Sequence, residues 1–294
     1  MTGVQTCALP ICRTGRDYAH EKPVDDKTFE TFRSRYAYDK TPLEAKTEYR
    51  DDSNEYWIKE KVSFRTVYGG ERMSGYLYLP RNAKPPFQTV IWAPPGDAHM
   101  LRSSESGIHT AAFGYLLQTG RAVFHPVYQS TYERRLADDA GRNSRREANV
   151  QYAKDVFQSV DFLESRPEID RQRLGYHGLS AGTWLGIFAL AFETRVRAAV
   201  LSAGGLLAAP LLPEADGFNY APRVKMPVLM INGRYDFAYP LEESQKPLFR
   251  LLGTPAADKR HALFDSGHVA PQQETMREVL AWFDHYLGPV ALTR

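Results

Sequence analysis

The residues best suited to chemistry lie in the stretch "RLGYHGLSAGTWLG", where Ser180 stands between Gly178 and Gly182. "RLGYHG" predicts a strand and residues 181–192 predict a helix, so the serine falls on a sharp strand-to-helix turn. Glycines have no Cβ, so they let the strand and the helix approach closely around an exposed hydroxyl. The pattern predicts a nucleophilic serine, although the same pentapeptide also occurs in ordinary Gly- and Ala-rich turns. We expect the Ala181 N–H, at the start of the helix, to face developing negative charge.

A serine nucleophile needs a base, and the base needs an orienting carboxylate. His268 is the candidate base, because it lies in a predicted loop between the last strand and the last helix, on the same sheet edge as Ser180. The alternative is that His268 is an ordinary solvent-exposed loop residue without a catalytic role. Asp236 follows a hydrophobic strand and completes the chain order serine, aspartate, histidine. The other nearby carboxylates are predicted to be turn or solvated residues: Asp265, Glu214 and Asp216.

A second backbone donor for an oxyanion is predicted in the segment "APPGDAH", which follows the apolar strand at 88–93. The N–H of Asp97, directly after Gly96, is the candidate. A plain Pro-Gly turn without a catalytic part is the alternative, because backbone donors leave little side-chain signature.

Strands and helices alternate along most of the chain. A hairpin is predicted first, with strands near 57–67 and 72–79 on both sides of Gly69-Gly70. Predicted strands then cover 88–93, 121–126, 173–178, 197–203, 227–233 and 260–265, and predicted helices cover 106–118, 148–164, 181–192, 241–252 and 272–287. This order predicts an α/β fold with a mostly parallel, doubly wound sheet and an N-terminal antiparallel hairpin.

Two long connections leave the carboxyl ends of predicted strands, Val127–Asn149 and Gly204–Arg223. Open α/β sheets place their ligands at this edge, so we expect both connections to wall a pocket. The stretch "GGLLAAPLLP" (204–213) would line it with aliphatic side chains. Further candidates for the lining are Tyr128, Tyr132 and Leu179, with ordinary core packing as the alternative for the tyrosines. The arginine-rich run at 132–147 is predicted to be a solvated face rather than an anion site.

Three segments are expected along the chain. Residues 1–12 resemble translated sequencing-adapter sequence and are predicted to be a non-native leader that packs against nothing. Residues 13–55 are polar and are predicted to be a loosely packed lead-in with a helix near 27–38. Residues 56–294 are predicted to form the α/β domain. No signal peptide is visible, and the sequence assigns no compartment.

Three stretches of the chain resemble a known protein family. The stretches "SVDFLESRPEIDRQRLGYHGLSAG", "PVLMINGRYDFAYPLEESQKPLFRLLG" and "FDSGHVAP" resemble the α/β-hydrolase superfamily. The similar branch contains acetyl-xylan-esterase-like, dienelactone-hydrolase-like and prolyl-oligopeptidase-like domains. The chain departs from the peptidases because it has no room for a propeller and lacks their second trailing glycine after the serine motif.

Together, the residues and the resemblance imply a serine hydrolase that cleaves small or short-chain carboxylic esters through an acyl-enzyme. Ser180 would attack, His268 would move the proton, and Asp236 would orient the imidazole. No cofactor, metal or nucleic acid is expected, since the net charge is +2 and no metal-ligand spacing is present. No apolar run reaches the roughly 18 residues of a membrane span. Alternatives are a peptidase or amidase, and a catalytically silent binding or sensory domain; the oligomeric state is not predicted.

Overall fold

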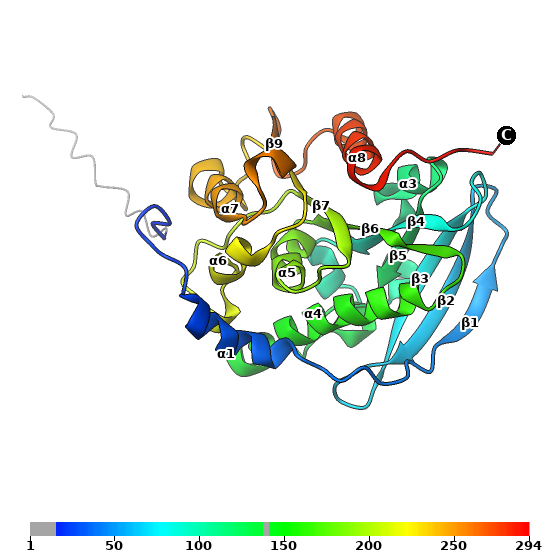
Figure 1. Cartoon of the computed structure of the whole chain (residues 1–294), viewed down its shortest axis with the longest axis horizontal. Coiled ribbons are helices and arrows are strands. Elements are labelled where there is room, and N and C mark those ends of the chain that lie inside the picture. The colour runs from blue at the N-terminus through cyan, green and yellow to red at the C-terminus, as the bar shows by residue number, and fades with distance from the viewer. Residues whose placement is uncertain (1–15, 138–140, 294) are drawn as a thin grey trace, which may run out of the picture.

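A nine-stranded sheet with helices on both faces organises the protein (Figure 1). The computed structural model describes residues 16–137 and 141–293, so the predicted leader lies outside the described residues. The strand order is β1-β2-β3-β5-β4-β6-β7-β8-β9. The strands are β1 (Lys46–Asp51), β2 (Trp57–Arg65), β3 (Arg72–Pro80), β4 (Phe87–Ala93), β5 (Ala122–Pro126), β6 (Ile169–Leu179), β7 (Val196–Ser202), β8 (Val228–Gly233) and β9 (Lys259–Phe264).

The pairing of the strands confirms the predicted fold class. β1, β2, β3 and β5 pair antiparallel in that order, and β5, β4, β6, β7, β8 and β9 pair parallel. The sheet is therefore mostly parallel, with the predicted hairpin in its antiparallel part. In β4, Ile91 and Ala93 face one core cluster whereas Val90 and Trp92 face the other, as the two-residue period of a strand requires.

Helices cover the two faces unequally. The helices are α1 (Asp26–Tyr36), α2 (Ser104–Gly107), α3 (Gly114–Gln118), α4 (Arg142–Glu164), α5 (Ala181–Leu190), α6 (Gly217–Tyr220), α7 (Lys246–Leu251) and α8 (Gln272–Leu287). α1, α4, α5, α6 and α7 contribute to one core cluster, while α3 and α8 contribute to the other. Both faces of the parallel strands are therefore buried, which explains their almost continuous apolar sequences.

The helix predicted at 106–118 is wrong, because the segment is broken into α2, a short 3-10 turn and α3. α2 ends at Gly107, and Ile108 is extended with φ −84° and ψ 112°. A Cβ on Gly107 would lie 3.0 Å from side-chain atoms of Leu101 and Tyr132. Tertiary packing at this glycine therefore overrides the local helical pattern. The predicted end of the segment is confirmed, since Gly120 has φ +82°.

The expectation that residues 13–55 pack loosely is also wrong. α1 begins after Asp25, whose side chain accepts the Thr28 N–H, and it buries Phe29, Phe32 and Tyr36. The Phe29 ring lies edge-on to Tyr220, with 5.2 Å between ring centroids. β1 then adds an edge strand to the sheet by pairing with β2. The N-terminal segment is therefore part of the core.

Candidate active site

Ser180 occupies the turn between β6 and α5 in a strained backbone conformation. Its φ is 54° and its ψ is −106°, a region that non-glycine residues rarely adopt. The Ser180 N–H donates to Ser202 O at 2.8 Å, which ties the turn to β7. The Thr183 hydroxyl, one turn into α5, donates to the same oxygen at 2.9 Å. These contacts hold the serine at the carboxyl edge of the sheet.

The two glycines of the motif are required by space. A Cβ on Gly178 would lie 2.5 Å from Gly182 O, and a Cβ on Gly182 would lie 2.3 Å from Ala93 O. Both obstacles are backbone atoms, which cannot rotate away. The sequence-based explanation, that the glycines let strand and helix approach closely, is confirmed by these distances.

The structure brings the three predicted side chains together. His268 Nε2 lies 2.9 Å from Ser180 Oγ, and His268 Nδ1 lies 3.0 Å from each carboxylate oxygen of Asp236. Asp236 is only 4% exposed, and its Oδ1 also accepts the backbone N–H groups of Ala238 and Tyr239 at 2.8 and 3.1 Å. These two donors give the buried Asp236 carboxylate hydrogen-bond partners besides His268. The serine can therefore donate its proton to the imidazole while the carboxylate fixes the ring.

The other carboxylates that the sequence placed nearby have different partners. Asp265 pairs with Arg234 at the surface, at 2.9 Å. The prediction that Asp216 is solvated is wrong, because this residue is 4% exposed, caps α6 and pairs with Arg16. Glu214 accepts from Arg146 at 2.8 Å.

Two aromatic rings flank the imidazole of His268. Tyr239 is stacked on it with 6.0 Å between centroids and 19° between planes, and Phe237 lies 6.3 Å away. Burial raises the pKa of the Tyr239 hydroxyl to about 12, so this side chain stays neutral. Both rings that flank His268 are therefore uncharged.

A further histidine lies beneath the turn. His177, in β6, is 2% exposed, and its Nε2 lies 2.9 Å from Ser202 Oγ. Burial lowers the pKa of His177 to about 3, so the ring is neutral in the folded protein. His177 thus supports Ser202, whose carbonyl holds the Ser180 N–H.

The two predicted backbone donors lie at the starts of two helical segments, since Ala181 begins α5 and Asp97 lies in the 3-10 turn Gly96–His99. Among the residues that the structure describes, neither the Ala181 nor the Asp97 N–H has a hydrogen-bond acceptor. A Cβ on Gly96, next to Asp97, would lie 4.0 Å from the Ala181 Cβ. At the end of the same turn, His99 Nδ1 lies 2.8 Å from Ser130 O, and burial lowers the pKa of His99. A neutral histidine therefore links this loop to the connection at 127–149.

A cavity of about 720 Å³ opens beside Ala181. Its apolar wall comes from α5 and from the predicted stretch "GGLLAAPLLP", through Trp184, Leu185, Leu207, Pro210, Leu211 and Leu212. Its opposite wall includes Gln129, Ser130, Arg135 and Tyr152, so both long connections do wall a pocket.

The predicted lining residues Tyr128 and Tyr132 lie in the core instead. Their exposed fractions are 0% and 3%, and the Tyr128 hydroxyl donates to Trp92 O at 3.1 Å. Leu179 is half-buried and packs against the core cluster that contains Tyr132. None of the three contributes to the cavity wall. Trp184, Tyr152 and His99, which do, carried no sequence signal beyond their position near a predicted strand or helix end.

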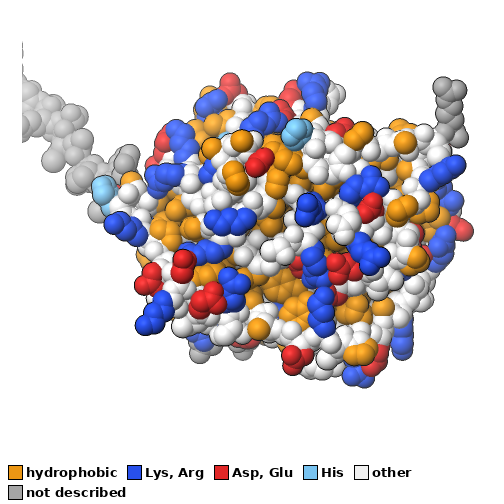
Figure 2. Space-filling view, viewed as in Figure 1, with side chains coloured by type: hydrophobic (Ala, Val, Ile, Leu, Met, Phe, Trp, Pro, Cys, Tyr) orange, Lys and Arg blue, Asp and Glu red, His pale blue; other side chains and the backbone are white. Residues whose placement is uncertain are grey.

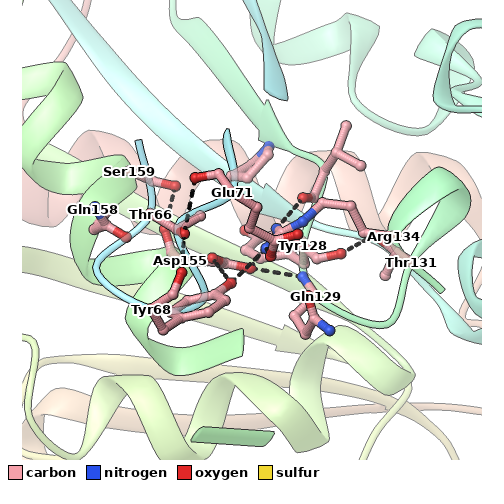
Figure 3. Close-up of polar contacts among 12 residues, drawn as sticks. Thr66, Tyr68, Glu71, Tyr128, Gln129, Thr131, Arg134, Asp155, Gln158 and Ser159 are labelled. Carbon is pink, nitrogen blue, oxygen red and sulfur yellow. Dashed lines mark hydrogen bonds and ion pairs between the residues drawn. The ribbon is translucent and has the colours of Figure 1, made fainter. Parts of the chain in front are cut away.

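A buried ion pair anchors the connection at 127–149 (Figure 3). Asp155, on α4, is fully buried and accepts from Arg134 at 2.8 Å, from the Gln129 N–H at 2.6 Å and from the Tyr68 hydroxyl. Arg134 also donates to Val127 O at 2.7 Å. The prediction of a solvated face at 132–147 is therefore wrong for Arg134, whose side chain is 8% exposed.

Neither a metal site nor a membrane-spanning helix is found among the described residues. Within 16–137 and 141–293, no group of three or more histidine, cysteine or acidic side chains could hold a metal ion. In the same residues, no helix is long and apolar enough to cross a bilayer. On the face shown in Figure 2, basic and acidic side chains are interspersed.

Comparisons with known proteins bear on the fold and the family of the chain. The chain is 28% identical over 171 residues to the uncharacterized protein PA2218 of Pseudomonas aeruginosa, a match that covers 56% of this chain and 39% of that protein. Among solved structures, it is similar to acetyl xylan esterase 1 from Thermoanaerobacterium sp., with a TM-score of 0.70 and 17% identity over 95% of this chain and 99% of that one. It is also similar to a cold-adapted esterase from an Arctic intertidal metagenomic library, with a TM-score of 0.65 and 19% identity over 82% and 99% of the two chains.

The structural likenesses, at these identities, establish the α/β-hydrolase fold. The sequence pattern of the Dienelactone hydrolase family matches residues 73–252, which is more than half of the 294 residues and includes Ser180 and Asp236. The chain therefore belongs to the dienelactone hydrolase family.

Proposed function

We propose that this protein hydrolyses carboxylic esters through an acyl-enzyme formed on Ser180. The observation that carries the proposal is the continuous hydrogen-bonded series from Ser180 Oγ through His268 to Asp236, at 2.9 and 3.0 Å, on a strained turn. A binding domain has no need for all three groups in this register.

We assign one role to each group in this series. Ser180 Oγ attacks the ester carbonyl carbon while His268 Nε2 takes the hydroxyl proton, and Asp236 stabilises the resulting imidazolium. The carbonyl oxygen becomes an oxyanion facing the Ala181 and Asp97 N–H groups, each of which stabilises it by roughly 3 kcal/mol when well aimed.

Collapse of this intermediate breaks the bond to the alcohol oxygen, which receives the proton from His268. Water then attacks the acyl-enzyme, with His268 again acting as the base, and the carboxylic acid leaves. Ser180 regains its proton at the end of the cycle.

The family and the esterase names of the structural neighbours support ester over amide bonds. The acyl group enters the cavity beside Ala181, against the aliphatic wall of 207–212. This wall selects short acyl groups that are apolar.

The test compares kcat/KM for p-nitrophenyl acetate, butyrate and decanoate with that for an aminoacyl p-nitroanilide. We expect the acetate or the butyrate to be the best substrate, and the anilide to be the poorest. Faster turnover of the anilide than of the short esters would replace this proposal with a peptidase function.

A further inference from the structure

Exposed apolar side chains gather around the histidine loop. The structure describes seven large hydrophobic side chains as exposed, and three of them directly adjoin Asp236 or His268 in the sequence: Tyr235 at 67%, Phe237 at 85% and Val269 at 56%. The Tyr235 N–H donates to Ser266 O at 3.0 Å, which holds the two loops side by side. Exposed apolar side chains beside a reactive centre can be covered by a bound ligand.

This surface is separate from the cavity. The cavity wall includes Ala181 and the 207–212 segment, but no residue of the segments 235–239 and 266–269. Two separate surfaces therefore adjoin the neighbours of Ser180: the cavity borders Ala181, and the exposed Phe237 ring lies beside His268. An ester also has two halves, which diverge from the carbonyl carbon.

Proton transfer decides which half meets which surface. The leaving alcohol oxygen must come within hydrogen-bond reach of His268 Nε2, since that atom carries the proton it receives. The acyl half, whose oxygen faces Ala181, is then directed to the cavity. The alcohol half passes beside the imidazole, where Phe237 lies 6.3 Å from the His268 ring. Tyr239, on the other flank, is 8% exposed and already packed, so Phe237 offers the accessible ring.

We infer that Phe237 forms a subsite for the alcohol half of the ester, with Tyr235 and Val269 exposed on the same two loops, and that this subsite favours aromatic alcohols. The phenyl ring has no hydrogen-bonding group, so it selects by apolar burial and ring contact. The inference rests on the proposed ester hydrolysis and assigns the surface that recognises the leaving group.

The experiment compares Phe237→Ala with the unchanged protein on benzyl acetate and methyl acetate. The two esters form the same acetyl-enzyme, and each is compared between proteins, so their intrinsic reactivities cancel. We expect the benzyl-to-methyl ratio of kcat/KM to fall by about three- to tenfold, the range of one lost aromatic contact. Phe237→Tyr keeps the ring and should restore the ratio. Tyr56→Ala removes a 48% exposed aromatic outside these loops and should leave the ratio as it is.

Three outcomes overturn the inference: an unchanged ratio in Phe237→Ala, an equal fall in Tyr56→Ala, or a change in oligomeric state with the ratio preserved. The last outcome would identify the surface as an interface between copies. Failure of the proposed function is distinguished by Ser180→Ala, because benzyl acetate hydrolysis that survives this change would not depend on the acyl-enzyme at all.

Discussion

At the scale of single residues, the Asp236 carboxylate has both a side-chain partner and backbone partners. It faces both His268 and the backbone N–H groups of Ala238 and Tyr239, and it is almost completely buried. Asp236→Asn keeps the shape of the side chain but can place an NH₂ donor where a carboxylate oxygen accepts from His268 Nδ1. The imidazole would then carry its proton on Nε2, where it cannot take the Ser180 proton. We expect kcat for p-nitrophenyl acetate to fall by about 10⁴-fold, as in other serine triads.

Asp265→Asn is the matched control, because this aspartate lies three residues from His268 in the sequence but pairs with Arg234. We expect little change in kcat for this variant. A larger loss in Asp265→Asn than in Asp236→Asn would show that the acid is assigned to the wrong residue.

The turn between β6 and α5 can be tested at the scale of elements. Gly182→Ala places a methyl group 2.3 Å from Ala93 O, so α5 must move away from β4. We expect the free energy of unfolding, measured in urea, to fall by about 1–3 kcal/mol, as for other overpacked positions. Gly114→Ala, at the start of α3 with nothing within 4 Å of the new Cβ, should cost less. Equal stabilities for the two variants would contradict the packing requirement.

At the scale of elements, His177 in β6 makes the free energy of unfolding of the protein depend on pH. Its pKa is about 3 in the folded protein against 6.5 for an unperturbed histidine, so only the unfolded chain takes up a proton between these values. Stability is therefore complete above pH 6.5 and is lost as the pH falls, on the order of 2 kcal/mol between pH 7 and pH 5 from this group. His125 and His261, with pKa values lowered to about 4 by burial, add to the same trend.

The measurement is the free energy of unfolding at pH 7 and pH 5. His177→Gln should reduce the difference between the two values, whereas His20→Gln, an exposed control, should not. If His177→Gln retains the full difference, the buried neutral histidine is not its source.

Local sequence patterns predicted the Ser180, Asp236 and His268 side chains better than they predicted the residues that line the cavity. The motif around Ser180 is contiguous in the sequence, and the chain order then selected Asp236 and His268 from predicted loops at one sheet edge. The pairing of Arg134 with Asp155 joins residues 21 positions apart, and only the packed structure shows that both are buried. Tyr128 and Tyr152 stack on each other in the same core cluster, and no sequence pattern predicted that only Tyr152 borders the cavity.

Helix prediction was also limited by contacts between residues that are far apart in the sequence. The helix at 272–287 was predicted with the bounds of α8, because its apolar period is uninterrupted. The helix predicted at 106–118 failed where Gly107 packs against Tyr132, a contact between distant segments. The spacing of Phe29, Phe32 and Tyr36 fits one helix face and could have indicated a packed helix, but the polar composition around it favoured a loose segment.

On the scale of the whole molecule, the N-terminal segment supports the cavity from outside. α1 packs on Tyr220, and the Val24 N–H donates to Asn219 at 2.9 Å, so the connection at 204–223 is held against it. Phe29→Ala should lower the free energy of unfolding by about 3–5 kcal/mol, the cost of a large cavity in a core. We also expect KM for p-nitrophenyl butyrate to rise, because the 207–212 wall loses its support.

Lys27→Ala, on the exposed side of the same helix, is the control for this prediction. Denaturant unfolding and steady-state kinetics on both variants provide the measurement. Equal stabilities would mean that α1 is not part of the core.

The central claim is that Ser180 is the nucleophile of an esterase, and covalent labelling tests it most directly. The intact protein is treated with a fluorophosphonate, and the modified residue is located by peptide mass spectrometry. We expect one adduct, on Ser180, with loss of esterase activity in proportion to labelling. We also expect Ser180→Ala to lower kcat by about a millionfold, as for other triad nucleophiles. An adduct on another residue, or a Ser180→Ala protein that still hydrolyses p-nitrophenyl acetate, would contradict the account.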